Sequence, residues 1–182
     1  MKTVLKLTLI LFFTEVGNAW AQTLYGTSVG EVSFYSDTPL ETIEALNKKS
    51  GAIINSDSRE IAVQMRITDF VFPNKLMQEH FNENYLESEK YPTAVFKGKI
   101  KEEVDLTVPG TYPVTADGSL TIHGVTKPIS VKGKITSTGK DLRLEFKFQV
   151  MPEDYQIEVP SLVITKIAEN IDVTGNMLLV KR

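Results

Sequence analysis

The sequence predicts an all-β protein with two short helices, folded as an antiparallel barrel of about eight strands. Apolar and polar residues alternate over several stretches, which is typical of strands with one buried and one solvated face. Short polar turns separate these stretches without regular helices between them, which favours an antiparallel barrel or sandwich over a parallel sheet. A barrel removes its exposed sheet edges by closing on itself, and about eight strands leave room inside for side chains or one ligand.

Each predicted strand is recognised by the apolar or small residues on one side of its alternation. The clearest example is residues 141–150, where charged or polar residues separate the inward positions. The inward sets, in chain order, are Gly30, Val32 and Phe34; Ile61, Val63, Met65 and Ile67; Ala94, Phe96, Gly98 and Ile100; Ile129, Val131, Gly133 and Ile135; Leu142, Leu144, Phe146, Phe148 and Val150; and Ile171, Val173, Gly175, Met177 and Leu179.

Turn residues lie between these stretches. Asp117-Gly118 predicts a hairpin between Val114-Thr115 and Leu120 to Ile122, because glycine accepts a positive φ without a Cβ clash. His123-Gly124 and residues 138–140 predict two further reversals. We expect His123 to have a structural role in its turn.

Two helices are expected among the strands. The first covers residues 39–48: Thr38 suits the N-cap, Pro39 the first helical position, and Glu41 completes a capping box. The second covers about residues 75–85 and carries apolar side chains near one face. Pro92 then forces the chain into an extended conformation. No linker or repeat divides the chain, so residues 22–182 form one predicted domain.

Residues 1–21 have the pattern of a signal peptide. Lys2 and Lys6 precede an apolar run, and small residues at Ala19 and Ala21 predict cleavage after Ala21. The alternative is an uncleaved anchor, but the run is shorter than the ~20 apolar residues that span a bilayer. We therefore expect a periplasmic or secreted protein without stable membrane insertion.

Composition excludes several functions. The formal net charge of −3 is opposite to the basic surface that binds nucleic acid. The absence of Cys excludes disulfides, thiolate catalysis and cysteine metal ligands. His80 lies beside Glu79 and Glu83 on the second predicted helix, but two or three such groups without a supporting cluster are a weak metal signal. We predict no metal site, no cofactor and no catalytic residues.

The inward sets also suggest an apolar cavity. They mix large aromatic residues with small ones, and two explanations of the inward glycines stay open: bends that close the barrel, or space for a long ligand. Tyr85, Tyr91 and Tyr155 combine an apolar ring with a polar tip, which suits a cavity mouth; for Tyr91, fixing the start of the next strand is the favoured role. The predicted ligand-binding residues are Val32, Phe34, Ile61, Val63, Met65, Phe96, Leu120, Ile122, Ile129, Val131, Leu144, Phe146 and Phe148 in the pore, with Phe81 and Tyr85 in a lid.

Three blocks resemble the YceI family of exported bacterial proteins. They are residues 77–98 (MQEHFNENYLESEKYPTAVFKG), residues 118–133 (GSLTIHGVTKPISVKG) and the ending from Phe148 through IDVTGNMLLV. The resemblance implies a lipocalin-like antiparallel barrel, extended along its axis, whose apolar pore holds a polyisoprenoid chain such as a polyprenyl phosphate or an isoprenoid quinone tail. One departure is the first strand, which lacks the Asp-x-x-His-Ser pattern of many relatives.

The leading hypothesis is therefore an exported protein that binds a long apolar isoprenoid lipid for carriage, storage or protection, without catalysis. One alternative is an enzyme that acts on a small molecule or lipid through His80 and a nearby Glu. Another is an envelope stress or scaffold barrel without a ligand. The sequence leaves open which lipid binds and whether the chain forms a homodimer.

Overall fold

The computed structural model describes residues 23–159 and 167–182. The predicted signal peptide lies outside the described residues. The strands are β1 (Leu24–Asp37), β2 (Thr42–Asn55), β3 (Glu60–Arg66), β4 (Phe70–Val71), β5 (Thr93–Ile100), β6 (Gly110–Ile122), β7 (Val125–Ser137), β8 (Asp141–Val150) and β9 (Ile171–Lys181). The helical segments are η1 (Ile67–Asp69), α1 (Lys75–His80), η2 (Phe81–Tyr85) and η3 (Pro152–Tyr155).

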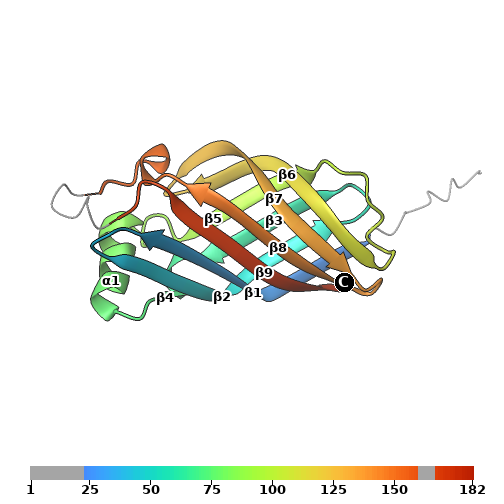
Figure 1. Ribbon diagram of the computed structural model, residues 1–182, viewed down its shortest axis with the longest axis horizontal. Coiled ribbons are helices and arrows are strands. Elements are labelled where there is room, and N and C mark those ends of the chain that lie inside the picture. The colour runs from blue at the N-terminus through green and yellow to red at the C-terminus, as the bar shows by residue number, and fades with distance from the viewer. Residues whose placement is uncertain (1–22, 160–166) are drawn as a thin grey trace, which may run out of the picture.

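Eight of these strands form a closed antiparallel barrel. Each strand pairs with its neighbours in the order β1-β9-β8-β7-β6-β5-β3-β2, and β1 closes the barrel by pairing with β2. The two-residue β4 is attached to β2 beside this circuit. The barrel is elongated, with α1 at one end and the C-terminus at the other (Figure 1). This confirms the predicted fold class.

Unequal strand lengths leave part of the barrel wall to a helical insertion. β1 and β2 have 14 residues each, but β3 has only 7. β3 pairs with residues 51–54 of β2, so among the described residues the first half of β2 pairs with β1 on one side and with the short β4 on the other. Residues 67–92, which carry α1 and η2, lie between β3 and β5 in the chain and cover this end of the barrel.

The helix predicted at residues 39–48 is wrong, because this segment is the turn and first half of β2. The capping-box residues instead close a tight hairpin turn: the Thr38 hydroxyl accepts the Glu41 amide at 3.1 Å, and the Thr38 amide donates to the Glu41 carbonyl at 3.0 Å. Ile43 and Ala45 then face inward and pair with β1. Non-local pairing overrides a local helix signal here.

The second predicted helix is confirmed. Asn74 caps α1 by accepting the Leu76 amide at 2.9 Å, and the helix continues through one π-helical turn, η2, to Tyr85. The β6–β7 hairpin at residues 123–124 is also confirmed, with φ of 51° at His123 and 73° at Gly124. The turn at residues 138–140 follows β7 as predicted.

The hairpin predicted at Asp117-Gly118 is wrong, because β6 runs without a break from Gly110 to Ile122. Gly118 pairs with Gly98 of β5, and a Cβ on Gly118 would lie 2.2 Å from the Lys97 carbonyl oxygen. Glycine is therefore required for the close approach of two backbones in the barrel wall.

We expect Gly118→Ala to lower the free energy of unfolding by about 1–3 kcal/mol, because a backbone atom cannot move aside as a side chain does. Urea denaturation followed by circular dichroism measures the change. Gly51→Ala is the matched control, since its added Cβ would meet nothing closer than 3.6 Å. Equal effects of the two substitutions would contradict this explanation of Gly118.

The end of the barrel away from α1 is filled by packed side chains. Tyr25, Ile54, Ile135, Leu142 and Leu179 are completely buried there. Leu106, from the loop between β5 and β6, is also buried, and its carbonyl accepts a hydrogen bond from the Ser137 hydroxyl at 2.7 Å. The loop thus closes this end of the barrel.

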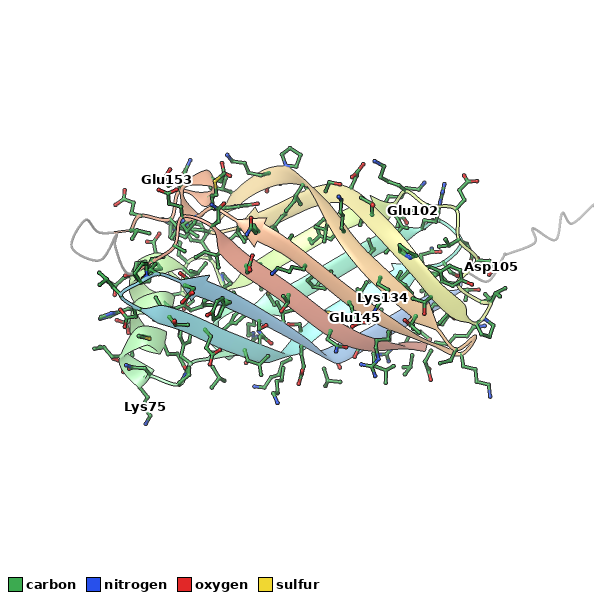
Figure 2. All side chains as sticks on the ribbon, viewed as in Figure 1. Lys75, Glu102, Asp105, Lys134, Glu145 and Glu153 are labelled. Carbon is green, nitrogen blue, oxygen red and sulfur yellow. The ribbon has the colours of Figure 1, made fainter. Side chains whose placement is uncertain are left out.

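Charged side chains cover the outside of the wall. Figure 2 shows Lys134 and Glu145 on neighbouring strands of this outer face, where they form an ion pair at 2.9 Å. Both side chains are substantially exposed, so this pair adds little to stability. The outer face therefore carries the polar half of the alternation, as predicted.

Candidate functional site

A cavity of about 390 Å³ lies inside the end of the barrel that carries α1. This size falls within the range of small-molecule sites, roughly 300–1,000 Å³. Nearly all of its lining is apolar, and its walls come from the barrel strands, the helical insertion and the segments beside residues 160–166. The described residues that line it are Phe34, Ser36, Glu41, Ile43, Met65, Ile67, Phe70, Phe72, Asn74, Leu76, Met77, His80, Phe81, Tyr85, Leu86, Ala94, Leu120, Ile122, Phe148, Val150, Pro152, Tyr155, Ile157, Val159, Ile167, Ile171 and Val173.

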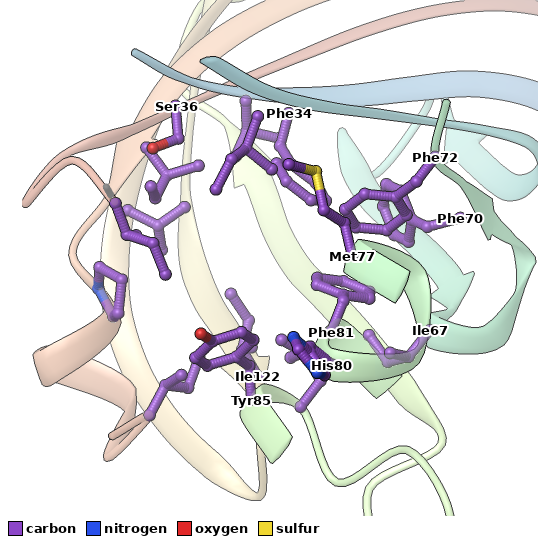
Figure 3. A pocket seen from close by; sticks show the side chains of 18 of the residues that line it. Phe34, Ser36, Ile67, Phe70, Phe72, Met77, His80, Phe81, Tyr85 and Ile122 are labelled. Atoms are coloured by element: carbon purple, nitrogen blue, oxygen red, sulfur yellow. The ribbon is translucent and has the colours of Figure 1, made fainter. Parts of the chain in front are cut away.

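Four phenylalanines form a cluster at one side of the cavity. The Phe81 ring lies 5.2 Å from Phe34, 5.8 Å from Phe70 and 5.0 Å from Phe72, measured between ring centroids. These separations are typical of favourable aromatic pairs. Figure 3 shows the four rings together, with Ser36 and Tyr85 toward the other side of the cavity. The cluster attaches η2 to the barrel and provides a rigid apolar wall.

Hydrogen bonds within the helical insertion fix where α1 begins. The Phe72 amide donates to the Gln78 side-chain oxygen at 3.1 Å, so the chain before α1 is held by the helix itself. The Asn82 amide group donates to the Gln78 carbonyl at 2.9 Å. Pro73 and the Asn74 cap fix where the helix begins. The insertion is thereby placed with Met77 and Phe81 toward the cavity.

A few polar groups interrupt the apolar lining. Burial, with a smaller contribution from the charge of Glu41, raises the pKa of the Tyr85 phenol above its usual value. Burial, followed by the charge of Asp154, likewise raises the pKa of Tyr155. Both phenols therefore stay neutral near pH 7, as does the Ser36 hydroxyl, which accepts the Ala168 amide at 2.9 Å. The lining offers neutral hydroxyls for a polar group of a ligand.

His123 joins three segments beside the cavity. Its Nε2 lies 2.7 Å from a Glu87 carboxylate oxygen, and its Nδ1 lies 3.1 Å from the Tyr155 carbonyl oxygen. The Tyr91 ring packs edge-on against the imidazole, with centroids 4.6 Å apart. The Glu87 carboxylate and the Tyr155 carbonyl thus hold the imidazole from its two nitrogen atoms. The β6–β7 turn is thus tied to the end of the helical insertion and to η3, which confirms its structural role.

We expect His123→Ala to lower the free energy of unfolding by about 1.5–3 kcal/mol, because the side chain is mostly buried and its hydrogen bonds include a charged partner. Hydrogen exchange should also become faster in residues 81–91, which His123 holds. Lys90→Ala is the control, because its 4.0 Å ion pair to the same Glu87 is exposed to solvent and adds little to stability. An equal effect of the two variants would contradict the role given to His123.

The fifteen residues predicted to bind ligand separate into two groups. Seven line the cavity: Phe34, Met65, Phe81, Tyr85, Leu120, Ile122 and Phe148. The other eight lie in the packed core or against it: Val32, Ile61, Val63, Phe96, Ile129, Val131, Leu144 and Phe146. Ligand contact by either group stays a prediction.

Sequence reasoning missed Phe70 and Phe72, which complete the aromatic cluster. The stretch DFVFPN is a short apolar run directly before a helix cap, and this signal was present in the sequence. The residues after η3, such as Ile157, were also missed. They follow no strand or helix pattern, so only the fold brings them to the cavity.

His80 lies at the rim of the cavity and is exposed. Within residues 23–159 and 167–182, no carboxylate lies within ion-pairing distance of His80, and no group of three or more His, Cys, Asp or Glu side chains could hold a metal ion. In the same part of the chain, no helix is both long enough and apolar enough to cross a membrane.

The fold and the cavity define a class: a closed up-and-down β-barrel with an apolar chamber at one end. The model of the YceI-like domain matches residues 25–178, so the chain belongs to the YceI family. Among curated relatives, the UPF0312 proteins of Pseudomonas savastanoi and Pseudomonas syringae are 33% identical over 88 residues, which is 47% of this chain and 42% of theirs. The matched segment thus spans less than half the length of these relatives.

Solved structures share the fold at low sequence identity. A polyisoprenoid-binding domain from Saccharophagus degradans superposes with a TM-score of 0.75 at 13% identity, covering 89% of this chain and 100% of that one. BcnA of Burkholderia cenocepacia gives a TM-score of 0.68 at 18% identity, covering 83% and 96%. The YceI protein of Campylobacter jejuni gives 0.55 at 13% identity, covering 100% and 99%.

Proposed function

We propose that this protein binds a lipid and holds the chain of an isoprenoid compound in the cavity beside α1. The observation that carries the proposal is the lining, in which the aromatic cluster and aliphatic side chains surround a space of about 390 Å³. Burial of an apolar chain contributes about 25 cal/mol per Å² of apolar surface, so affinity requires few polar contacts. The Saccharophagus degradans domain, which is described as polyisoprenoid-binding, supports the choice of ligand class.

The neutral hydroxyls suit the polar end of such a lipid. Tyr85 and Tyr155 line the cavity, and His80 is exposed at its rim. A quinone or alcohol head group is neutral and can accept or donate hydrogen bonds there. The proposal includes no catalytic step. In it, the protein carries, stores or protects the lipid.

We further propose that the protein is exported and acts outside the cytoplasm. Residues 1–21 support this through their basic start, apolar run and small residues at Ala19 and Ala21. N-terminal sequencing of the protein recovered from a periplasmic fraction or culture medium should give Gln22 as the first residue. Recovery of the full-length chain in the cytoplasm would contradict export.

Lipid extraction tests the binding proposal. The protein is purified without detergent from its own host and examined by native mass spectrometry before and after solvent extraction. We expect a bound mass whose fragmentation shows a repeating isoprene pattern. Only unliganded protein, in repeated preparations, would favour a scaffold barrel instead. Conversion of the lipid during incubation, abolished by His80→Ala, would favour the enzyme alternative.

A further inference from the structure

The inward glycines of the barrel do not leave space for a ligand. A Cβ on Gly175 would lie 2.1 Å from the Phe146 ring, and one on Gly98 would lie 2.7 Å from the Phe96 ring. A Cβ on Gly30 would lie 2.6 Å from the Met177 side chain. Larger side chains therefore already fill the space above these glycines. Of the two explanations that the sequence left open, space along the axis is excluded at these positions.

The cavity stops at the same height on several strands. On β5, Ala94 lines the cavity, but the next inward residue, Phe96, does not. On β8, Phe148 lines it, and Phe146 belongs to the layer below. The same step occurs from Phe34 to Val32 on β1 and from Met65 to Val63 on β3. The layer below the cavity is thus a floor across the barrel, formed by Val32, Val63, Phe96 and Phe146.

The two phenylalanines of this floor are held in place by glycines. Phe146 pairs with Gly133 on one side and with Gly175 on the other, and its ring packs over Gly175. Phe96 pairs with Val63 and Leu120, and its ring packs over Gly98. Below them lie the completely buried residues of the closed end. A chain that enters from the α1 end therefore meets packed side chains about halfway along the barrel.

We propose that Phe96 and Phe146 limit the length of chain that this protein can bury, so that the site selects a short prenyl chain or only the end of a long one. The inference rests on the proposed lipid binding and refines it. The cavity of about 390 Å³ lies near the lower end of the range for small-molecule sites, roughly 300–1,000 Å³. We therefore place the limit near the length of a farnesyl chain.

Competition among prenyl alcohols tests the limit. Geraniol, farnesol and geranylgeraniol are mixed in equal amounts with the delipidated full chain, and the complexes are counted by native mass spectrometry. Each buried methylene raises affinity roughly fourfold, so affinity should rise steeply from geraniol to farnesol. From farnesol to geranylgeraniol we expect the affinity to change by less than about threefold. The added carbons find no room above the floor and stay in water beyond the cavity mouth. If affinity kept rising steeply up to geranylgeraniol, the floor would not limit chain length, although lipid binding itself would be supported.

Phe146→Ala is expected to increase the length of prenyl chain that the cavity can bury. Removing the ring opens the space above Gly175, so geranylgeraniol should bind at least about tenfold more tightly than farnesol in this variant. Tyr35→Ala is the matched control, because it removes an aromatic ring from the outer face of β1, where Tyr35 is 43% exposed, and should leave the plateau at farnesol. Phe96→Ala repeats the test from the opposite wall if Phe146→Ala does not fold. Unchanged preference in a folded floor variant would contradict the proposal, whereas failure of all three alcohols to bind wild type would contradict lipid binding itself.

Discussion

Leu142→Ala is expected to lower the free energy of unfolding by about 3–5 kcal/mol while leaving lipid affinity unchanged. Leu142 is completely buried in the closed end of the barrel, where it pairs with Leu179, which is also completely buried. The rigid barrel cannot collapse around the lost side chain, so the variant loses both apolar burial and packing contacts. Urea denaturation measures the first quantity and lipid titration the second.

Leu178→Ala is the matched control for this prediction. Leu178 is the neighbour of Leu179 on β9, but it points to the outer face and is 51% exposed. Its replacement should change the free energy of unfolding by less than about 0.5 kcal/mol. If Leu142→Ala were tolerated as well as Leu178→Ala, the closed end would not be a packed core. A large loss of lipid affinity in a folded Leu142→Ala variant would place the lipid in the closed end of the barrel, which contradicts a site at the α1 end.

Met65→Gln is expected to weaken lipid binding by roughly tenfold to a hundredfold, with a smaller effect on folding. Met65 is 9% exposed, and its side chain lines the cavity on β3. Glutamine has a similar size, but a bound lipid chain would remove water from its amide without replacing the hydrogen bonds. That loss costs about 1–3 kcal/mol in proteins. Isothermal titration calorimetry with farnesol measures the affinity.

Leu178→Gln supplies the control for Met65→Gln. It introduces the same amide on the outer wall, where water solvates it, so lipid affinity should stay within about twofold of wild type. Circular dichroism establishes that both variants are folded before titration. Equal lipid affinity for Met65→Gln and wild type would show that the chain does not occupy the cavity described here.

Period-two alternation was sufficient to predict the barrel and most inward-facing residues. It predicted the inward sides of β3, β5 and β8, because a strand in a closed sheet has one buried face whatever its neighbours are. The failure at residues 39–48 has a different cause. Thr38, Pro39 and Glu41 form a good helix start by local rules, yet the same hydrogen-bonding groups also close a hairpin turn. Only pairing with β1 decides between the two.

Glycine signals were ambiguous for a related reason. Asp117-Gly118 has the composition of a hairpin turn, but Gly118 lies mid-strand because another backbone comes close to it. His123-Gly124 has a similarly plain turn signal, and there the positive φ angles are present. Sequence shows that a glycine is needed without showing whether a turn, a bend or a neighbouring ring requires it.

The candidate site could be predicted only in part, because alternation does not reveal height along the barrel axis. Met65 and Val63 face inward on the same strand, but one lines the cavity and the other lies in the floor. The same holds for Phe148 and Phe146. The boundary depends on how eight tilted strands align, and this alignment is a property of the closed sheet.

The central claim is that a lipid chain lies between the aromatic cluster and the floor, at the α1 end of the barrel. The most direct test is a crystal structure of the protein purified without detergent from its own host. We predict elongated density that begins near Tyr85, passes between Phe34 and Phe148, and ends above Phe96 and Phe146. A cavity filled by the protein's own side chains, or density confined to the outer wall, would contradict the claim.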